Sequence, residues 1–218
     1  MSIPEIAPYP MPLAGELPDN QVTWTVDPDR AVLLVHDLQR YFLDPFPAHA
    51  SPTTDLLSNI QVLRELCTER GMPVSFSVQP GDMSDADRGL LKDFWGPGMS
   101  REPRHRRVVG RLTPTTHDHV FIKTRYSAFH RTPLLEFLHR SGRDQLIICG
   151  VYAHIGCLLT ACDAFTNDIQ PFLVADAIAD FTPALHQQAL DYAARRCGVV
   201  LTSANLVASL GAATSGVT

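Results

Sequence analysis

One stretch decides the fold of this chain: Ala31-Val32-Leu33-Leu34-Val35-His36-Asp37. Its first five residues are aliphatic, and a continuous aliphatic run predicts a strand buried on both faces, as in a parallel sheet. The run ends at Asp37, and burying a carboxylate costs free energy unless it has a partner or a function. Because the carboxyl ends of strands in open α/β sheets face the ligand crevice, Asp37 is the first candidate functional residue. The alternative interpretation is that Asp37 caps a helix that follows.

The composition is that of a single globular domain. The chain has 218 residues, of which 45% are hydrophobic and 19% charged, enough to bury a core without disulfides or metals. The net charge of −5 at pH 7 gives no electrostatic reason to bind nucleic acid or an anionic membrane. No apolar run approaches the roughly 18 residues that a membrane-spanning helix needs. We therefore expect neither nucleic acid nor a membrane as a partner.

The cysteines indicate a reducing compartment. They are five in number, lack CxxC spacing and mostly fall inside apolar segments, so we interpret them as reduced core thiols. The N-terminus lacks the basic segment and apolar run of a signal peptide. We therefore expect a cytoplasmic protein.

Five further segments have the pattern of strands, and helical segments separate most of them. The predicted strands are residues 73–79, 119–122, 145–151, 172–176 and 199–201, and the predicted helices are residues 55–70, 134–140, 156–167 and 183–197. This alternation predicts right-handed crossovers and a doubly wound, Rossmann-like three-layer α/β fold with a six-stranded parallel sheet. No GxGxxG follows a strand, so a dinucleotide is not indicated.

The ends of the chain differ from its middle. Residues 1–30 hold six prolines and little periodicity, which predicts an extended arm packed on the domain. Residues 31–207 form the predicted domain, and residues 208–218 are mostly small and uncharged, which predicts a flexible tail. Residues 82–118 are the least regular region of the domain, and we interpret them as a lid or binding loop.

Polar side chains follow four of the predicted strands, namely Asp37, Gln79, Lys123 and the group 152–154. All four strand ends meet at one edge of a parallel sheet, where ligands bind. A carboxylate opposite an ammonium, with amide and phenol groups nearby, suits an anionic substrate and proton transfer. The alternative is an ordinary ion pair between Asp37 and Lys123.

Seven stretches of the chain resemble the isochorismatase family: IPEIAPYPMP, AVLLVHDLQRYF, QPGDM, LLKDFWGPGM, KTRYSAF, CGVYAHIGC and DAFTNDIQPFLVADAIADF. They follow one another in the family order over residues 3–205, and the likeness is greatest to the phenazine-pathway enzymes. The resemblance implies hydrolysis of the enolpyruvyl vinyl ether of 2-amino-2-deoxyisochorismate or isochorismate. The products would be pyruvate and trans-2,3-dihydro-3-hydroxyanthranilate or 2,3-dihydro-2,3-dihydroxybenzoate.

The resemblance also implies the catalytic group, which is Asp37 as general acid with Lys123 and Gly156. Members of the wider cysteine-hydrolase superfamily carry a nucleophilic cysteine at the position of Gly156. Cys157 is one residue further, and one residue turns a helical side chain by about 100°, away from the crevice. We therefore expect no covalent intermediate, and we disfavour amide cleavage. Our hypothesis for Lys123 is that it pairs with a substrate carboxylate and positions Asp37.

Six more residues are implied as substrate-binding: Phe42, Gln79, Arg88, Trp95, Tyr126 and Tyr152. Gln79, Arg88 and Tyr152 would be partners of the two carboxylates and the ring substituents. Phe42 and Trp95 would be apolar walls, and Tyr126 would line the pocket. Gly156 would leave space for the substrate and offer a backbone N–H. The alternatives are plain core positions for Phe42 and Trp95 and a surface position for Arg88.

No metal or cofactor is expected, because the metal-ligand pattern of the amidase branch is absent. We interpret the triplet His117-Asp118-His119 as surface polar residues. The length of the chain and its arm favour the amino substrate, and the length leaves no room for a fused carrier domain. The resemblance also implies a homodimer, because members of the family are commonly homo-oligomers. The alternatives are an isochorismatase for catechol siderophore biosynthesis and a catalytically silent binding module. Residues 101–118, within the predicted lid or binding loop, match the family least well.

Overall fold

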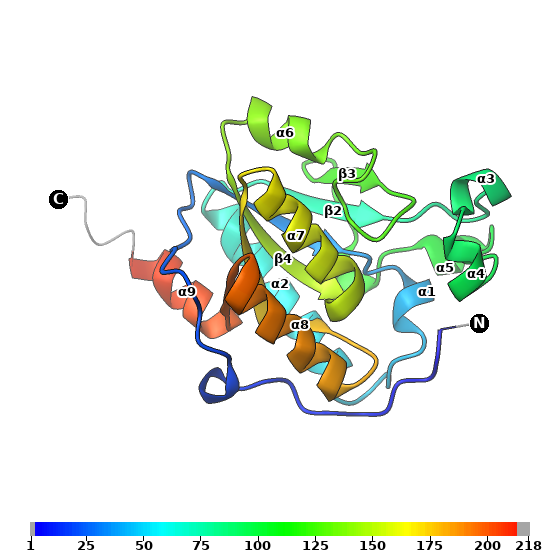
Figure 1. The fold of residues 1–218 in the computed structure, drawn as a ribbon, viewed down its shortest axis with the longest axis horizontal. Coiled ribbons are helices and arrows are strands. Elements are labelled where there is room, and N and C mark those ends of the chain that lie inside the picture. The colour runs from blue at the N-terminus through cyan, green and yellow to red at the C-terminus, as the bar shows by residue number, and fades with distance from the viewer. Residues whose placement is uncertain (1–2, 213–218) are drawn as a thin grey trace.

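The computed structural model describes residues 3–212, and a six-stranded sheet forms its centre (Figure 1). The strands are β1 (Ala31–His36), β2 (Val74–Val78), β3 (His119–Ile122), β4 (Gln145–Val151), β5 (Gln170–Ala179) and β6 (Val199–Leu201). Their order is β3-β2-β1-β4-β5-β6, and every pairing is parallel. The predicted doubly wound fold is therefore confirmed.

The central strand β1 lies between β2 and β4, and all six of its residues are buried. Its last residue, His36, stands beside Gly150 of β4. Gly150 has a φ of 118°, and a Cβ there would lie 2.1 Å from the His36 backbone oxygen. Only glycine lets the two strands approach this closely at the edge where the polar residues gather.

Helices cover both faces of the sheet (Figure 1). The helices α2 (Thr53–Glu69) and α9 (Ser203–Ala212) pack on one face. The other face carries α6 (Leu134–Arg140), α7 (Leu158–Thr166) and α8 (Pro183–Arg196). Alternate β1 residues belong to the two cores, since Leu33 faces α2 and Leu34 faces the α6–α8 layer. This is the three-layer arrangement expected from the sequence.

The carboxyl end of the sheet is covered by short helices. These are α1 (Arg40–Leu43), α3 (Asp85–Arg88), α4 (Leu91–Trp95) and α5 (Pro103–Arg106), with a 3-10 turn η2 (Gly110–Leu112). They gather at one end of the molecule in Figure 1. A single π-helical turn, η3 (Ala153–Cys157), leads from β4 into α7. The region 82–118 is therefore a cap of short helices over the strand ends.

The N-terminal arm, of which the structure describes residues 3–30, packs along the domain. It contains one 3-10 turn, η1 (Ala14–Glu16), and its side chains Ile6, Tyr9 and Met11 are buried. The Asn20 side chain bonds the backbone N and O of Val200 at 2.7 and 2.9 Å. The arm therefore satisfies backbone groups of the edge strand β6, which would otherwise be open to another chain.

The predicted flexible tail begins too early in the chain. Residues 203–212 form α9, so the expected flexible segment is wrong for residues 208–212. Leu206 and Leu210 are fully buried against the α2 side of the sheet, which explains why this apolar end is helical. Residues 213–218 lie outside the described residues. Within residues 3–212, no helix is long and apolar enough to cross a membrane.

Candidate active site

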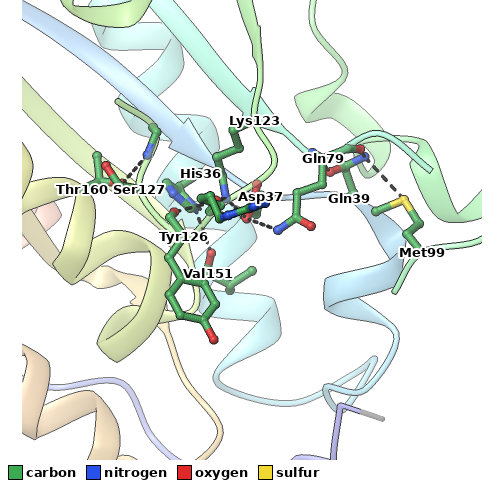
Figure 2. Close-up of polar contacts among 12 residues, drawn as sticks. His36, Asp37, Gln39, Gln79, Met99, Lys123, Tyr126, Ser127, Val151 and Thr160 are labelled. Atoms are coloured by element: carbon green, nitrogen blue, oxygen red, sulfur yellow. Dashed lines mark hydrogen bonds and ion pairs between the residues drawn. The ribbon is translucent and has the colours of Figure 1, made fainter. Parts of the chain in front are cut away.

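Three polar residues meet where three neighbouring strands end. Asp37, Gln79 and Lys123 directly follow β1, β2 and β3, and Asp37 lies between the other two (Figure 2). Lys123 Nζ is 2.7 Å from Asp37 Oδ2, and Gln79 Nε2 is 3.5 Å from the same oxygen. The parallel sheet places these residues together as its topology predicts.

The backbone of Asp37 leaves the strand in an unusual conformation. Its φ is 50°, in the left-handed region that aspartate tolerates better than most residues. Its N–H donates to the Ser77 carbonyl at 3.0 Å. The next helix, α1, has Gln39 as its N-cap, so the interpretation of Asp37 as a helix cap is wrong.

Lys123 is 1% exposed, and its ammonium bonds only inside the protein. Besides Asp37, it donates to the carbonyls of Arg125 at 3.0 Å and Tyr126 at 3.2 Å. An ammonium has three N–H donors, and these three acceptors use all of them. Our hypothesis that Lys123 pairs with a substrate carboxylate is therefore not supported, because its charge is directed at Asp37.

The two oxygens of Asp37 are not equivalent. Oδ2 faces Lys123, whereas Oδ1 is buried and has no hydrogen-bond partner among residues 3–212. A buried carboxylate oxygen without a partner is costly in a completed fold. Asp37 also lines a cavity beneath the short helices. Asp37 therefore has one carboxylate oxygen that no group of the described chain bonds, on a residue that lines the cavity.

All nine residues that the sequence analysis singled out line this cavity. They are Asp37, Phe42, Gln79, Arg88, Trp95, Lys123, Tyr126, Tyr152 and Gly156. The sequence analysis missed six further lining residues, which are Ile3, Tyr41, Leu91, Val151, Ile155 and Phe181. Ile3 and Phe181 come from distant segments, the arm and the turn after β5. No local pattern in the sequence indicates that they reach the cavity.

Arg88 is a buried cation at the cavity wall. Its side chain belongs to α3, and its Nε donates to the Gly96 carbonyl at 2.9 Å. Gly98 makes this possible, since a Cβ there would lie 2.7 Å from the Arg88 guanidinium carbon. Burial lowers the pKa of Arg88 from its usual value, and no carboxylate of the described chain forms an ion pair with it. A surface position for Arg88 is therefore wrong, and its free N–H groups suit a ligand carboxylate.

The aromatic residues form walls of the cavity, and two of them are joined by a hydrogen bond. The Tyr152 hydroxyl donates to the Phe42 carbonyl at 2.6 Å, so its proton is not free for a substrate and its ring forms a wall. Trp95 Nε1 donates to the Tyr126 hydroxyl at 2.7 Å. This bond leaves the Tyr126 O–H as a donor and ties α4 to the loop after β3.

Gly156 has a different role from the expected one. A Cβ built on it would lie 2.2 Å from Cε1 of His36, so the space beside Gly156 holds the His36 ring and is not free for substrate. Cys157 is fully buried in the α7–α8 core, and burial raises the pKa of its thiol well above the usual range. The structure thus turns Cys157 away from the cavity, as the helical spacing predicts.

Gln39 is a further residue that the sequence analysis missed. It is 1% exposed, and its side-chain amide pairs with the backbone of Gln79. Oε1 accepts from the Gln79 N–H at 2.7 Å, and Nε2 donates to the Gln79 carbonyl at 2.9 Å and the Arg106 carbonyl at 3.0 Å. Gln39 therefore fixes the end of β2 relative to the end of β1 and the cap.

The acidic and histidine residues form no metal site within the described part of the chain. In the triplet 117–119, Asp118 pairs with Arg64 at 2.7 Å. His117 and His119 are exposed.

Comparisons with known proteins agree on one family. The family model described as Isochorismatase domain matches residues 31–205. The isochorismatase of Bacillus subtilis is 52% identical over 210 residues, which cover 96% of this chain and 67% of that protein. Phenazine biosynthesis protein PhzD1 of Pseudomonas aeruginosa is 54% identical over 201 residues, covering 92% of this chain and 96% of that protein.

A solved structure shows the same fold. The cysteine hydrolase from Pseudomonas syringae pv. phaseolicola superposes with a TM-score of 0.80 at 24% identity, covering 88% of this chain and 97% of that one. At this identity the likeness concerns the fold alone. The predicted family resemblance is confirmed by the family model and the curated relatives.

Proposed function

The chain belongs to the isochorismatase family, and from this premise we propose that it hydrolyses the enolpyruvyl vinyl ether of 2-amino-2-deoxyisochorismate or isochorismate. It is an isochorismatase-type hydrolase, similar to an isochorismatase and to a phenazine biosynthesis protein. The observation that carries the proposal is the carboxyl group of Asp37, which lines the cavity and whose Oδ1 has no hydrogen-bond partner among residues 3–212. An acid at that place suits protonation of a carbon, a step that needs no nucleophile.

The proposed reaction begins when Asp37 transfers a proton to the terminal methylene carbon of the enolpyruvyl group. The π electrons of the double bond form the new C–H bond, and an oxocarbenium ion results. Water adds to this cation and gives a proton back to the Asp37 carboxylate, which restores the acid. The hemiketal then collapses to pyruvate and the ring alcohol as its hydroxyl proton moves to the ring oxygen. No bond to the protein forms, which agrees with the absence of a side chain at Gly156.

Lys123 acts on the charge that this transfer creates. Asp37 becomes a carboxylate when it gives up its proton, and the Lys123 ammonium lies 2.7 Å from its Oδ2. The carboxylate in turn faces the cationic oxocarbenium carbon. Fixed charges at the place where charge develops stabilise a transition state without reorganisation. General-acid catalysis of this kind contributes roughly 10²–10⁴-fold.

Arg88 is the proposed partner of a substrate carboxylate. Its guanidinium is buried beside the cavity and has no carboxylate of its own among residues 3–212. The Tyr126 hydroxyl and the Gln79 amide are proposed donors to the other polar groups. Phe42, Trp95 and Tyr152 enclose the substrate and exclude bulk water from the oxocarbenium ion. The family resemblance implies that these residues bind the substrate, and all of them line the cavity.

The two candidate substrates differ by an amino group and a hydroxyl group. A site that does not bond this group tolerates both substrates. We favour the amino substrate, because the chain covers nearly the whole of the phenazine biosynthesis relative. The hydroxy substrate of a siderophore pathway is the second candidate. A homodimer and a cytoplasmic location accompany the proposal as predictions.

The test is release of pyruvate, coupled to lactate dehydrogenase, with each substrate offered separately. Wild type is compared with Asp37→Asn and with the control Asp191→Asn, whose carboxylate lies on α8 and bonds Gln187 at 3.3 Å. We expect Asp37→Asn to lose roughly 10²–10⁴-fold in kcat and the control to match wild type. Near-wild-type turnover of Asp37→Asn would show that Asp37 is not the general acid. No pyruvate from either substrate with wild type would favour the binding module.

A further inference from the structure

A buried histidine lies directly behind the proposed acid. His36, the last residue of β1, is 0% exposed. Its Nδ1 is 3.1 Å from the Val151 carbonyl and 3.6 Å from Asp37 Oδ2 (Figure 2). The reaction proposed above does not use this ring, although it touches the acid and the end of β4.

The ring of His36 fills the space beside Gly156. A Cβ on Gly156 would lie 2.2 Å from Cε1, 2.9 Å from Nδ1 and 3.0 Å from Nε2 of His36. Two of these distances are shorter than real Cβ contacts. A ring that is fully enclosed and bonded to Val151 has no room to withdraw. Residues 36 and 156 are therefore sterically complementary, one large and one without a side chain.

The ring is neutral where it lies. Burial lowers the pKa of His36 to about 4, against which the neighbouring Asp37 acts only in part. A neutral imidazole has one N–H, and the Val151 carbonyl requires that hydrogen on Nδ1. The 3.6 Å contact with Asp37 is therefore a packing contact and not an ion pair.

These contacts place His36 on the Oδ2 side of Asp37, together with Lys123. The imidazole and the ammonium both contact Oδ2 of the carboxylate, whereas Oδ1 has no hydrogen-bond partner among residues 3–212. We propose that His36 is a positioning residue that orients Asp37 for proton transfer while occupying the place of any side chain at Gly156. The inference rests on the proposed function for its kinetic part, whereas the steric pairing stands on the fold alone.

The kinetic test compares His36→Leu with His36→Asn. Leucine fills much of the volume but removes the donor to Val151, whereas asparagine keeps an amide donor near the place of Nδ1. We expect His36→Leu to lose about 10- to 100-fold in kcat, as a small misplacement of a catalytic group does, with KM changed less than about 3-fold. His36→Asn is expected to recover most of the lost kcat.

The matched control is His186→Asn, which also removes a buried imidazole. His186 is 1% exposed and bonds the Ala175 carbonyl at 3.0 Å, outside the cavity. We expect this control to lower Tm and leave kcat of the folded enzyme unchanged. If His36→Leu behaves in the same way, with lowered Tm and wild-type kcat, its role is structural and the positioning proposal is overturned.

The steric test is a double-mutant cycle between His36→Ala and Gly156→Ala, read by Tm and by kcat. Gly156→Ala alone collides with the imidazole, so we expect it to lower both quantities. In the His36→Ala background the new methyl group enters vacated space, and its cost should largely disappear. Additive effects of the two substitutions on Tm would overturn the pairing.

The two proposals fail separately. If wild type releases no pyruvate from either substrate, the proposed function fails, but the coupling of the two substitutions in Tm still decides the steric pairing. If wild type releases pyruvate and the two substitutions are additive, the proposed function stands and the inference about His36 fails.

Discussion

Replacing Lys123 by methionine tests how the proposed acid is held. The change keeps the length of the side chain but removes the ammonium that lies 2.7 Å from Asp37 Oδ2. It also leaves the Arg125 and Tyr126 carbonyls without this donor. Asp37 is 5% exposed and Lys123 1%, so water can replace few of the hydrogen bonds that the ammonium made.

The magnitude follows from the distance. Two unit charges 2.7 Å apart at an effective dielectric constant of about 20 attract by about 6 kcal/mol. Breaking a buried pair by removing one partner costs about 3–5 kcal/mol of folding stability. If a third of the attraction acts only on the carboxylate formed in the transition state, kcat falls about 30-fold.

The assay combines urea unfolding with pyruvate release for Lys123→Met, Asp37→Asn and the double variant. We expect the double variant to lose less free energy of unfolding than the two single variants lose in sum, because it leaves no buried charge unpaired. The control is Lys92→Met, which removes an ammonium that is bonded to Asp85 at 2.6 Å on the surface and should leave Tm and kcat near wild type. A Lys123→Met variant with wild-type stability and turnover would refute the reasoning.

Three further predictions follow from other contacts. Arg88→Lys removes the bidentate guanidinium donor and should raise KM at least about 10-fold, with a smaller change in kcat. An unchanged KM in steady-state kinetics would show that Arg88 does not bind the substrate. Stability should fall as the pH drops from 7 to 5, because His36 and His186 have pKa values of about 4 in the fold against about 6.5 when unfolded, so the unfolded chain binds more protons in that window. Each histidine should contribute about 2 kcal/mol to this loss, measured by urea unfolding at the two pH values, and equal stability at both would contradict the buried neutral state. Gln39→Ala removes both bonds to the Gln79 backbone and should lower kcat/KM about 10-fold. Wild-type kinetics in this variant would show that the end of β2 holds its position without Gln39.

The sheet and its functional edge could be predicted from the sequence for a simple reason. Continuous aliphatic runs mark strands that are buried on both faces, and the first polar residue after each run marks the strand end. Asp37, Gln79 and Lys123 come together because parallel strands end at one edge. The chemistry implied by the family resemblance then falls on residues that line one cavity.

The errors concern contacts that depend on how distant segments pack. The sequence gives no sign that the His36 ring enters the space beside Gly156, since that contact depends on the approach of β1 and η3. It also gives no sign that the Lys123 ammonium finds two backbone carbonyls in its own loop. The apolar spacing of Leu206 and Leu210 is a local signal, and it could have predicted α9 in place of a tail.

The most direct test of the central claim follows the isotopes of the reaction. The reaction is run in D2O enriched in ¹⁸O, and the pyruvate is captured at once by lactate dehydrogenase. Protonation of the methylene carbon and addition of water to the oxocarbenium ion predict lactate with one deuterium in its methyl group and ¹⁸O at C2, with no ¹⁸O in the ring alcohol. A methyl group without deuterium, or ¹⁸O in the ring alcohol, would contradict proton transfer from Asp37 to the vinyl ether.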